Sequence, residues 1–499
     1  MADAVSVLQD GKIFLGESIH PEYLELRLAN RHGLVTGATG TGKTVSLQVM
    51  AEGFSDAGVP VFAADIKGDL SGISEVGQPK DFLLARAKDV GLTDYQNKAY
   101  PTVFWDLFGE QGHPVRATVQ EMGPLLLARL LELNEVQEGV LNIMFRVAAD
   151  EKLPLLDLKD LRAMANDIGQ RGKDLQTKYG TAAAISVGAI QRRLLVLEEQ
   201  GANNFFGEPA LDINDFMRTA PDGRGIVNIL AADKLMKTPR LYATFLLWMM
   251  SELFEKMPEV GDPEKPKLVF FFDEAHLLFD EAPKALLEQV ERVTRLVRSK
   301  GVGVYYVTQN PRDVPNTVSA QLGNRIQHAL RAFTPLEQKG IRAAAETFRP
   351  NPDLDTERVI QELKVGEALV SMLTNKGEPS MVQRTLIRPP SGRIGPVTPE
   401  ERRKLIENSP VYGKYDEAID RESAYETLTK RAEAAQAQEA QEEQAKQAGA
   451  NSWGKVIFGR GPRGGASMGE LVIRDVTRSL TRSVVTQVKN AILRSFFKR

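Results

Sequence analysis

Residues 34–44 have the sequence Leu34-Val35-Thr36-Gly37-Ala38-Thr39-Gly40-Thr41-Gly42-Lys43-Thr44, which matches the phosphate-loop pattern G-x-x-x-x-G-K-[ST]. In this pattern the glycines let backbone N–H groups surround the phosphates, the lysine reaches the β- and γ-phosphates, and the final hydroxyl binds Mg²⁺. An apolar segment precedes the loop and a segment with helical spacing follows it, a context that disfavours a chance match. The sequence therefore predicts that a nucleoside triphosphate binds at Gly37, Ala38, Thr39, Gly40, Thr41, Gly42, Lys43 and Thr44, with Thr44 on the metal.

The composition is that of an ordinary globular protein. The chain has 499 residues, of which 42% are hydrophobic, and this length suggests about two to four domains. Its net charge is −3, so any nucleic-acid-binding surface must be local. The lack of cysteine excludes disulfides and thiolate metal sites, and with an N-terminus unlike a signal peptide it favours a cytoplasmic location. Residues 241–250, the most apolar stretch, are too few to span a bilayer and predict a core helix.

A second motif completes the expected site. Residues 267–272 predict an apolar strand that ends in Asp273 and Glu274. Asp273 is suited to the Mg²⁺ shell, and Glu274 can orient or deprotonate the attacking water. The string Asp-Glu-Ala-His at 273–276 also spells a helicase box, but the other motifs of that class are missing, and His276 is expected to be a packed residue.

Polar residues follow two further predicted strands. Residues 301–307 predict a strand beside the Asp273 strand, which would turn Gln309 toward the γ-phosphate as a sensor of hydrolysis; the alternative is a turn-forming amide. Asp65 and Asp69 follow the strand predicted at 59–65. They contact Mg²⁺ or its waters, or they only cap a helix and a turn; the sequence leaves both open.

Three arginines are candidates for action in trans. Arg325, Arg331 and Arg342 lie close together in the sequence, and in ring-forming ATPases such a residue often reaches the γ-phosphate of the next subunit. Arg325 and Arg331 flank the strand-like residues 326–330 and are preferred over Arg342.

The predicted domain organisation is an N-terminal β-hairpin region at 1–30, a core at 31–118 and 219–395, a helical insertion at 119–218, a charged helical linker at 396–450, and a glycine-rich segment with a basic amphipathic helix at 451–499. Strands at 12–16 and 23–28 should pair, and a hairpin of 367–373 with 380–387 should close the edge of the core. The last segment has ten basic and two acidic residues, or +8. Its helix could lie on nucleic acid, an anionic membrane or a partner subunit, or dock on its own core.

The phosphate loop, residues 65–69, the Asp273-Glu274 strand end and the Thr308-Gln309 strand end, in this order, resemble the HerA/FtsK superfamily of ring ATPases. Residues 331–335 and 409–415 resemble, more narrowly, the bacterial DUF853 group of HerA-like C-terminal-domain proteins. The resemblance implies an α/β fold with a RecA-like P-loop ATPase core of the additional-strand catalytic-glutamate class, ATP hydrolysis with Mg²⁺, and a homohexamer that translocates DNA. The short N-terminal region, the helical insertion and the basic tail depart from archaeal HerA.

Four functions are compatible with these features. The first is a ring-forming ATPase that moves or remodels DNA, with Lys43, Glu274, Gln309 and a neighbour's arginine in catalytic roles. The second is an ATP-driven motor or switch that acts on a protein or a membrane through the basic tail. The third, a small-molecule phosphotransferase, is disfavoured because Glu274 beside Asp273 suits water as the nucleophile. The fourth is a nucleotide-binding scaffold without hydrolysis.

Overall fold

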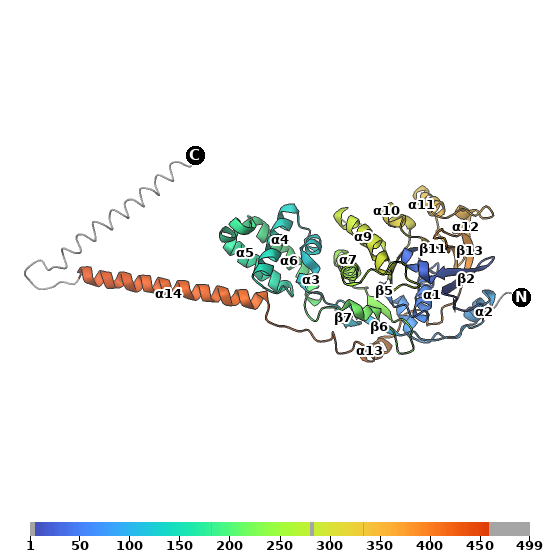
Figure 1. The fold of residues 1–499 in the computed structure, drawn as a ribbon, viewed down its shortest axis with the longest axis horizontal. Helices are drawn as coiled ribbons and strands as arrows, with labels where there is room; N and C mark the ends of the chain where they lie inside the picture. Colours follow the sequence, from blue (N-terminus) through green and yellow to red (C-terminus); the bar gives the residue numbers. More distant parts are fainter. Residues whose placement is uncertain (1–4, 181, 280–283, 333, 459–499) are drawn as a thin grey trace, which may run out of the picture. The chain divides into compact units, whose positions relative to one another are not determined.

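The structure is a computed structural model that describes residues 5–180, 182–279, 284–332 and 334–458 (Figure 1). In these residues one mixed sheet contains thirteen strands. The strands are β1 (Leu8–Gln9), β2 (Lys12–Glu17), β3 (Pro21–Glu25), β4 (Gly33–Thr36), β5 (Val61–Asp65), β6 (Thr102–Asp106), β7 (His113–Pro114), β8 (Val227–Ala231), β9 (Leu268–Phe272), β10 (Val302–Thr308), β11 (Asn324–Gln327), β12 (Glu367–Ser371) and β13 (Gln383–Ile387).

The order of the strands determines where the site forms. The sheet runs β1-β2-β13-β12-β11-β4-β10-β9-β5-β8-β6-β7, with β3 paired to β2. From β11 to β7 all neighbours are parallel, whereas β12, β13, β2, β1 and β3 pair antiparallel. β10 lies between the phosphate-loop strand β4 and the Asp273 strand β9, with Tyr305 opposite Gly33 on one side and Phe271 on the other. The expected α/β fold with an additional strand between the two motif strands is therefore confirmed.

Helices cover both faces of the sheet. Those in the described residues are α1 (Lys43–Asp56), α2 (Asp81–Asp89), α3 (Val119–Leu130), α4 (Glu135–Asp150), α5 (Leu158–Tyr179), α6 (Ala184–Glu199), α7 (Pro239–Lys256), α8 (His276–Phe279), α9 (Lys284–Val297), α10 (Asn316–Ser319), α11 (Pro335–Glu346), α12 (Thr356–Glu362), α13 (Pro399–Glu407) and α14 (Ala424–Phe458). Short 3₁₀ helices include Leu26–Arg31 and Asp69–Ser74.

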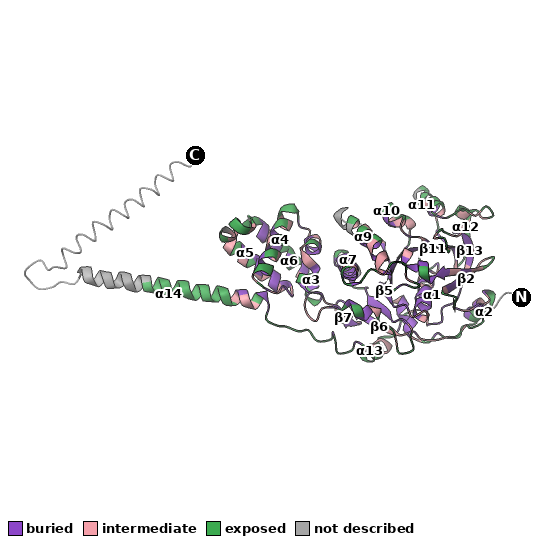
Figure 2. Ribbon diagram, in the orientation of Figure 1, coloured by how far each residue is buried: buried purple, intermediate pink, exposed green. Residues whose placement is uncertain are grey.

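Successive side chains of β9 point to opposite faces of the sheet, and helices pack on each face, so the fold has three layers: helices, sheet and helices. Phe270 and Phe272 join the core that includes α7 and α9, and Val269 and Phe271 join the opposite core, which includes α1. Every residue of β9 is buried, as is every residue of its neighbour β5 (Figure 2), as expected for parallel strands covered on both faces. The sheet therefore holds the ends of its central strands rigidly, and these ends carry the predicted site residues.

Four helices, α3 to α6, lie between β7 and β8 in the chain. Each of the first three begins with a capping box: Thr118 with Glu121, Asn134 with Gln137, and Asp157 with Asp160. Their apolar faces share one core with α7, and α3 packs against α7. The boundaries of the predicted insertion, and of the other predicted domains, stay a prediction.

One expectation about the sheet is wrong. β12 and β13 form the expected antiparallel hairpin, but they do not close the edge of the sheet, because β13 also pairs with β2 through Leu386 and Glu17. The N-terminal hairpin of β2 and β3 is thereby part of the central sheet. Its second strand ends at Glu25, before the expected residue 28, because residues from Leu26 turn into a 3₁₀ helix.

The C-terminal region separates from the rest of the chain. The described residues up to Thr429 belong to one compact unit, and the chain divides between Thr429 and Lys430. Helix α14 continues across this division, and its residues 432–445 are exposed. The predicted basic amphipathic helix lies outside the described residues. Among the described helices, none has the length and apolarity that a membrane span requires.

Candidate nucleotide site

The phosphate loop connects β4 directly to α1. Gly37, Gly40 and Gly42 have φ angles of 154°, 76° and 114°, in a region that glycine adopts without strain. A Cβ on Gly37 would lie 2.5 Å from the Cβ of His328, so a side chain does not fit there. The first helical bond runs from the N–H of Ser46 to the carbonyl of Gly42. The N–H groups before Ser46 at the start of α1 are therefore available to an anion.

Lys43 lies inside the loop. Its Nζ donates to the carbonyl oxygens of Gly37 at 2.6 Å and Ala38 at 3.2 Å. An ammonium group has three donors, so one donor remains for a phosphate oxygen. Burial lowers the pKa of Lys43, and the negative charge of Glu274 opposes this effect. The ammonium group of Lys43 is therefore confined within the loop, where a bound phosphate would supply the negative charge that pairs with it.

Asp273 and Glu274 follow β9, as predicted. Burial, followed by the charge of Glu274, raises the pKa of Asp273 to about 6. Glu274 is 2% exposed and has a φ of 47°, a left-handed conformation that is uncommon outside glycine and occurs at functional sites. Oδ1 of Asp273 accepts a hydrogen bond from the N–H of Glu274 at 2.9 Å, which fixes the turn between the two carboxylates.

Gln309 connects the two motifs. Its Nε2 donates to both carboxylate oxygens of Glu274, at 3.3 and 3.2 Å, and its Oε1 accepts from the hydroxyl of Thr39 at 3.3 Å. This contact follows from the position of β10 between β4 and β9. The predicted neighbourhood of Gln309 and the Asp273 strand is thus present, and the sensor role stays a prediction.

Lys67 was missed by the sequence analysis as a site residue. It lies in the turn after β5, and its Nζ donates to Oε1 of Glu274 at 2.5 Å. Burial raises the pKa of Glu274, but the hydrogen bond and charge of Lys67 outweigh burial, so that the pKa lies below its usual value. His276 also contacts this carboxylate, with Nδ1 3.4 Å from Oε2. Glu274 is therefore held by three side chains from three elements.

Asp65 takes the structural role that the sequence analysis allowed. Its carboxylate accepts hydrogen bonds from the N–H of Gly68 at 2.8 Å and of Leu70 at 3.1 Å. Burial and then the charge of Asp273 raise the pKa of Asp65 to about 7. Asp69 begins the 3₁₀ helix that this turn starts. Asp65 therefore shapes the turn that carries Lys67 and also belongs to the buried acidic group around Asp273.

His328 is a second residue that the sequence analysis missed. It follows β11 and is fully buried under the phosphate loop. Its Nε2 lies 2.9 Å from Oγ of Ser46, and its Nδ1 lies 3.0 Å from the carbonyl of Glu367. His328 therefore connects the start of α1 to β12 and supports the loop from below.

The candidate arginines differ in their surroundings. Arg325 on β11 is largely buried and donates to the carbonyl of Ser319 at 2.8 Å. Arg331 is exposed and donates to the backbone carbonyls of Gln361 and Leu363 at the end of α12. Arg342 on α11 lies 3.6 Å from Glu357. Of the two preferred residues, only Arg331 is exposed; it lies two residues after Ala329, whose carbonyl accepts from the N–H of Ala38 in the phosphate loop.

The residues present fit a nucleotide with Mg²⁺. The glycine loop, the free N–H groups of α1 and the confined Lys43 provide positive charge for phosphates. Thr44 lies in the first turn of α1, and Asp273 provides a buried carboxylate, so these two would hold the metal; their role as metal ligands stays a prediction. In the described residues no group of three or more His, Cys, Asp and Glu side chains is placed to hold a metal ion.

The comparison with known protein families agrees with this geometry. A family model described as "Helicase HerA-like C-terminal" matches residues 12–499. The chain belongs to this HerA-like family. Among curated proteins, "Probable helicase MJECL08" of Methanocaldococcus jannaschii is 29% identical over 154 residues. This match covers 29% of the HerA-like chain and 28% of the relative, so it spans less than a third of either protein.

Two solved structures are similar to the HerA-like chain. The bacterial conjugative coupling protein TrwBdeltaN70 has a TM-score of 0.51 and 14% identity, with 76% of this chain and 89% of TrwBdeltaN70 covered. VirB4 of Thermoanaerobacter pseudethanolicus has a TM-score of 0.47 and 12% identity, with coverages of 80% and 100%. The similarity to TrwBdeltaN70 shows that the fold is shared, and the fold is that of RecA-like P-loop ATPases.

Proposed function

We propose that this HerA-like protein is an ATP-hydrolysing motor that works as a homohexameric ring and moves or remodels DNA. The observation that carries the proposal is the position of Gln309, which bridges the phosphate loop at Thr39 and the carboxylate of Glu274. A residue that contacts both groups can change the position of the Glu274 carboxylate when nucleotide binds in the phosphate loop. A scaffold that only binds nucleotide has no need of such a bridge.

The side chains have distinct roles in this proposal. Lys43 and the N–H groups at the start of α1 bind the phosphates. Thr44 and Asp273 would hold Mg²⁺, which would supply positive charge to the phosphate oxygens. Glu274 accepts the proton of the attacking water, and Lys67 and Gln309 hold its carboxylate in place. The buried turn at Asp273 keeps the two carboxylates in distinct positions, one for the metal and one for water.

What the relatives bind and how one is named support the nucleotide and DNA parts of the proposal. TrwB has structures in complex with the non-hydrolysable ATP analogue ADPNP and with ADP and Mg²⁺. The curated relative carries the name of a helicase. DNA stimulation and a hexamer are part of our proposal for this chain, and a local basic surface would be needed because the net charge is −3.

The test is ATP turnover at rising protein concentration, with and without double-stranded DNA, for wild type and Lys43→Ala. We expect turnover per subunit to rise with concentration and with DNA, and to be lost in Lys43→Ala because that variant lacks the phosphate-binding cation. Sedimentation of the same samples should show a hexamer-sized species. Turnover that DNA leaves unchanged would overturn DNA as the substrate, and turnover retained in Lys43→Ala would overturn the assigned site.

A further inference from the structure

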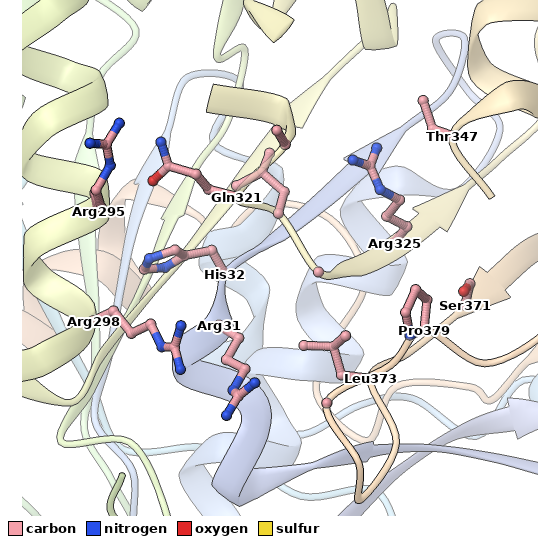
Figure 3. A pocket seen from close by; sticks show the side chains of 14 residues that line it. Arg31, His32, Arg295, Arg298, Gln321, Arg325, Thr347, Ser371, Leu373 and Pro379 are labelled. Carbon is pink, nitrogen blue, oxygen red and sulfur yellow. The ribbon is translucent and has the colours of Figure 1, made fainter. Parts of the chain in front are cut away.

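A cavity lined by arginines lies away from the nucleotide site. It has a volume of about 470 Å³, within the range of about 300–1,000 Å³ that small-molecule sites occupy. Four arginines line it, from the segment before β4, the end of α9, the 3₁₀ turn after α9, and β11: Arg31, Arg295, Arg298 and Arg325 (Figure 3). The cavity is therefore a concentration of positive charge in a protein whose net charge is −3.

The cavity and the phosphate loop lie at opposite edges of the parallel strands. Arg31 and His32 come directly before β4, whereas Gly37 comes directly after it. Arg298 likewise precedes β10, and Gln309 follows it. A strand rises about 3.3 Å per residue, so the four residues of β4 separate the two sites by roughly 13 Å. A phosphate in the loop of the same subunit therefore does not neutralise these arginines.

The acidic partners of the cavity are few and loosely placed. Asp262 is 4.0 Å from Arg31 and 3.7 Å from Arg298, and its side chain is 68% exposed. Arg295 pairs with Glu291 at 2.8 Å. Within the described residues, Arg325 forms no salt bridge and donates only to Ser319. Exposed pairs at such distances contribute little energy, so four guanidinium groups face two carboxylates and a net positive charge remains.

His32 adds a buried donor to the cavity wall. Its Nδ1 accepts a hydrogen bond from the N–H of Val304 at 3.0 Å. Burial lowers the pKa of His32 to about 4, so the ring is neutral and its proton is assigned to Nε2. This Nε2, in a residue that is 2% exposed, has no hydrogen-bond partner of acceptable geometry among the described residues, and neither has Nε of Arg31. Each atom is a donor without a well-formed hydrogen bond, although the backbone of Thr294 lies close enough to the His32 ring to raise its pKa in part.

We propose that this cavity is a second anion site that binds a phosphate-bearing ligand. Phosphate oxygens are acceptors only, and guanidinium groups bind them in a bidentate manner. A multiply charged phosphate matches the excess positive charge and the unpartnered donors better than a neutral ligand does. The phosphates come either from a free polyphosphate or nucleotide, or from a nucleic-acid backbone. The site is separate from the proposed nucleotide site, and its occupancy does not depend on hydrolysis.

The test uses full-length Lys43→Ala protein, in which the phosphate loop is weakened, and isothermal titration with inorganic pyrophosphate and with a DNA duplex. In this background, Arg295→Ala/Arg298→Ala should weaken binding at least tenfold, because two charge-assisted contacts are lost. The side chains of Arg295 and Arg298 are 66% and 44% exposed, so the fold should be retained, which circular dichroism checks. The matched control is Lys300→Ala, a neighbouring cation outside the cavity lining.

The pattern of losses identifies the source of the phosphates. If the double variant loses pyrophosphate binding but keeps duplex binding, the ligand of the cavity is a free anion. If it loses binding of both probes, the ligand is the nucleic-acid backbone. If the double variant binds both probes as tightly as the Lys300→Ala control, the proposal is overturned. If citrate binds as tightly as pyrophosphate, the cavity does not select phosphate, and the proposal of a phosphate-bearing ligand is overturned.

Discussion

Lys67 and Glu274 form an ion pair in which Nζ lies 2.5 Å from Oε1. The two residues come from the turns after β5 and β9, which are adjacent strands. The carboxylate is almost fully buried, whereas the Lys67 side chain is 44% exposed. The ion pair therefore links the buried carboxylate of Glu274, the proposed base, to the solvent-accessible ammonium group of Lys67.

The first prediction concerns this pair. Lys67→Met should lower ATP turnover at neutral pH by about tenfold, because Glu274 loses the charge that offsets burial beside Asp273. Removal of Lys67 raises the pKa of Glu274, so the acidic limb of the pH–rate profile should move to higher pH. Lys67→Arg should restore both properties. Steady-state turnover across pH measures the effect, with the exposed Lys80→Met as control; an unshifted profile in Lys67→Met would contradict it.

The second prediction separates binding from hydrolysis. Glu274→Gln keeps the size of the side chain but cannot accept the proton of water, so turnover should fall by about 10²–10⁴-fold. Nucleotide affinity should stay close to wild type, because Lys43 and the loop are unchanged. Binding of a fluorescent ATP analogue beside turnover measures both quantities. Hydrolysis at more than half of the wild-type rate would mean that another group activates the water.

Sequence reasoning found the residues whose chemistry is encoded locally. The phosphate loop and the Asp273-Glu274 pair are each contiguous, and the apolar segments beside them mark the strands that carry them. The pairing of β10 with β9 was predicted from the residues, whereas the place of an additional strand between the two motif strands came from the family resemblance, because local patterns do not specify strand order. The same limit explains the wrong expectation for β13, whose partner β2 is more than 360 residues away in the chain.

Lys67 and His328 were missed for a related reason. Their contacts join residues 207 and 282 positions apart in the sequence, Lys67 with Glu274 and His328 with Ser46. A lone lysine or histidine in a turn carries no pattern that predicts such a contact. Lys67 lies within residues 65–69, which helped to indicate the family, and this was the available signal. Arg325 and Arg331 could not be ranked by spacing, because burial distinguishes them and burial depends on the fold.

The third prediction tests which arginine acts in trans. Arg331 is the candidate, because its side chain is exposed and so accessible to a neighbouring subunit, whereas Arg325 is largely buried. Arg331→Ala should keep nucleotide binding and lose most turnover. A mixture of Arg331→Ala with Glu274→Gln should regain activity, since a subunit that retains Glu274 can receive Arg331 from its neighbour.

Turnover of mixed subunits at varied ratios measures this complementation. Arg325→Ala provides the comparison: it keeps Arg331 and Glu274, so it should retain turnover by itself, and mixing it with Glu274→Gln should add no activity. If the Arg331→Ala mixture stays inactive while the Arg325→Ala mixture regains activity, the assignment is reversed in favour of Arg325.

The fourth prediction concerns pH and the support of the phosphate loop. Burial lowers the pKa of His328 to about 4, whereas an unfolded histidine titrates near pH 6.5. The unfolded state therefore binds more protons between these values, so stability falls as the pH drops from 6.5 toward 4. Between pH 7.5 and 5.5 this linkage should cost roughly 1 kcal/mol for His328.

Urea unfolding at both pH values measures this loss. In His328→Gln the decrease from pH 7.5 to 5.5 should be smaller by about 1 kcal/mol, even though the variant is less stable at pH 7.5 because Ser46 loses its partner. The exposed His20→Gln serves as control and should behave as wild type. An equal decrease in His328→Gln and wild type would show that His328 titrates alike in the folded and unfolded states, and the loop would then rest on a histidine that protonates without unfolding the protein.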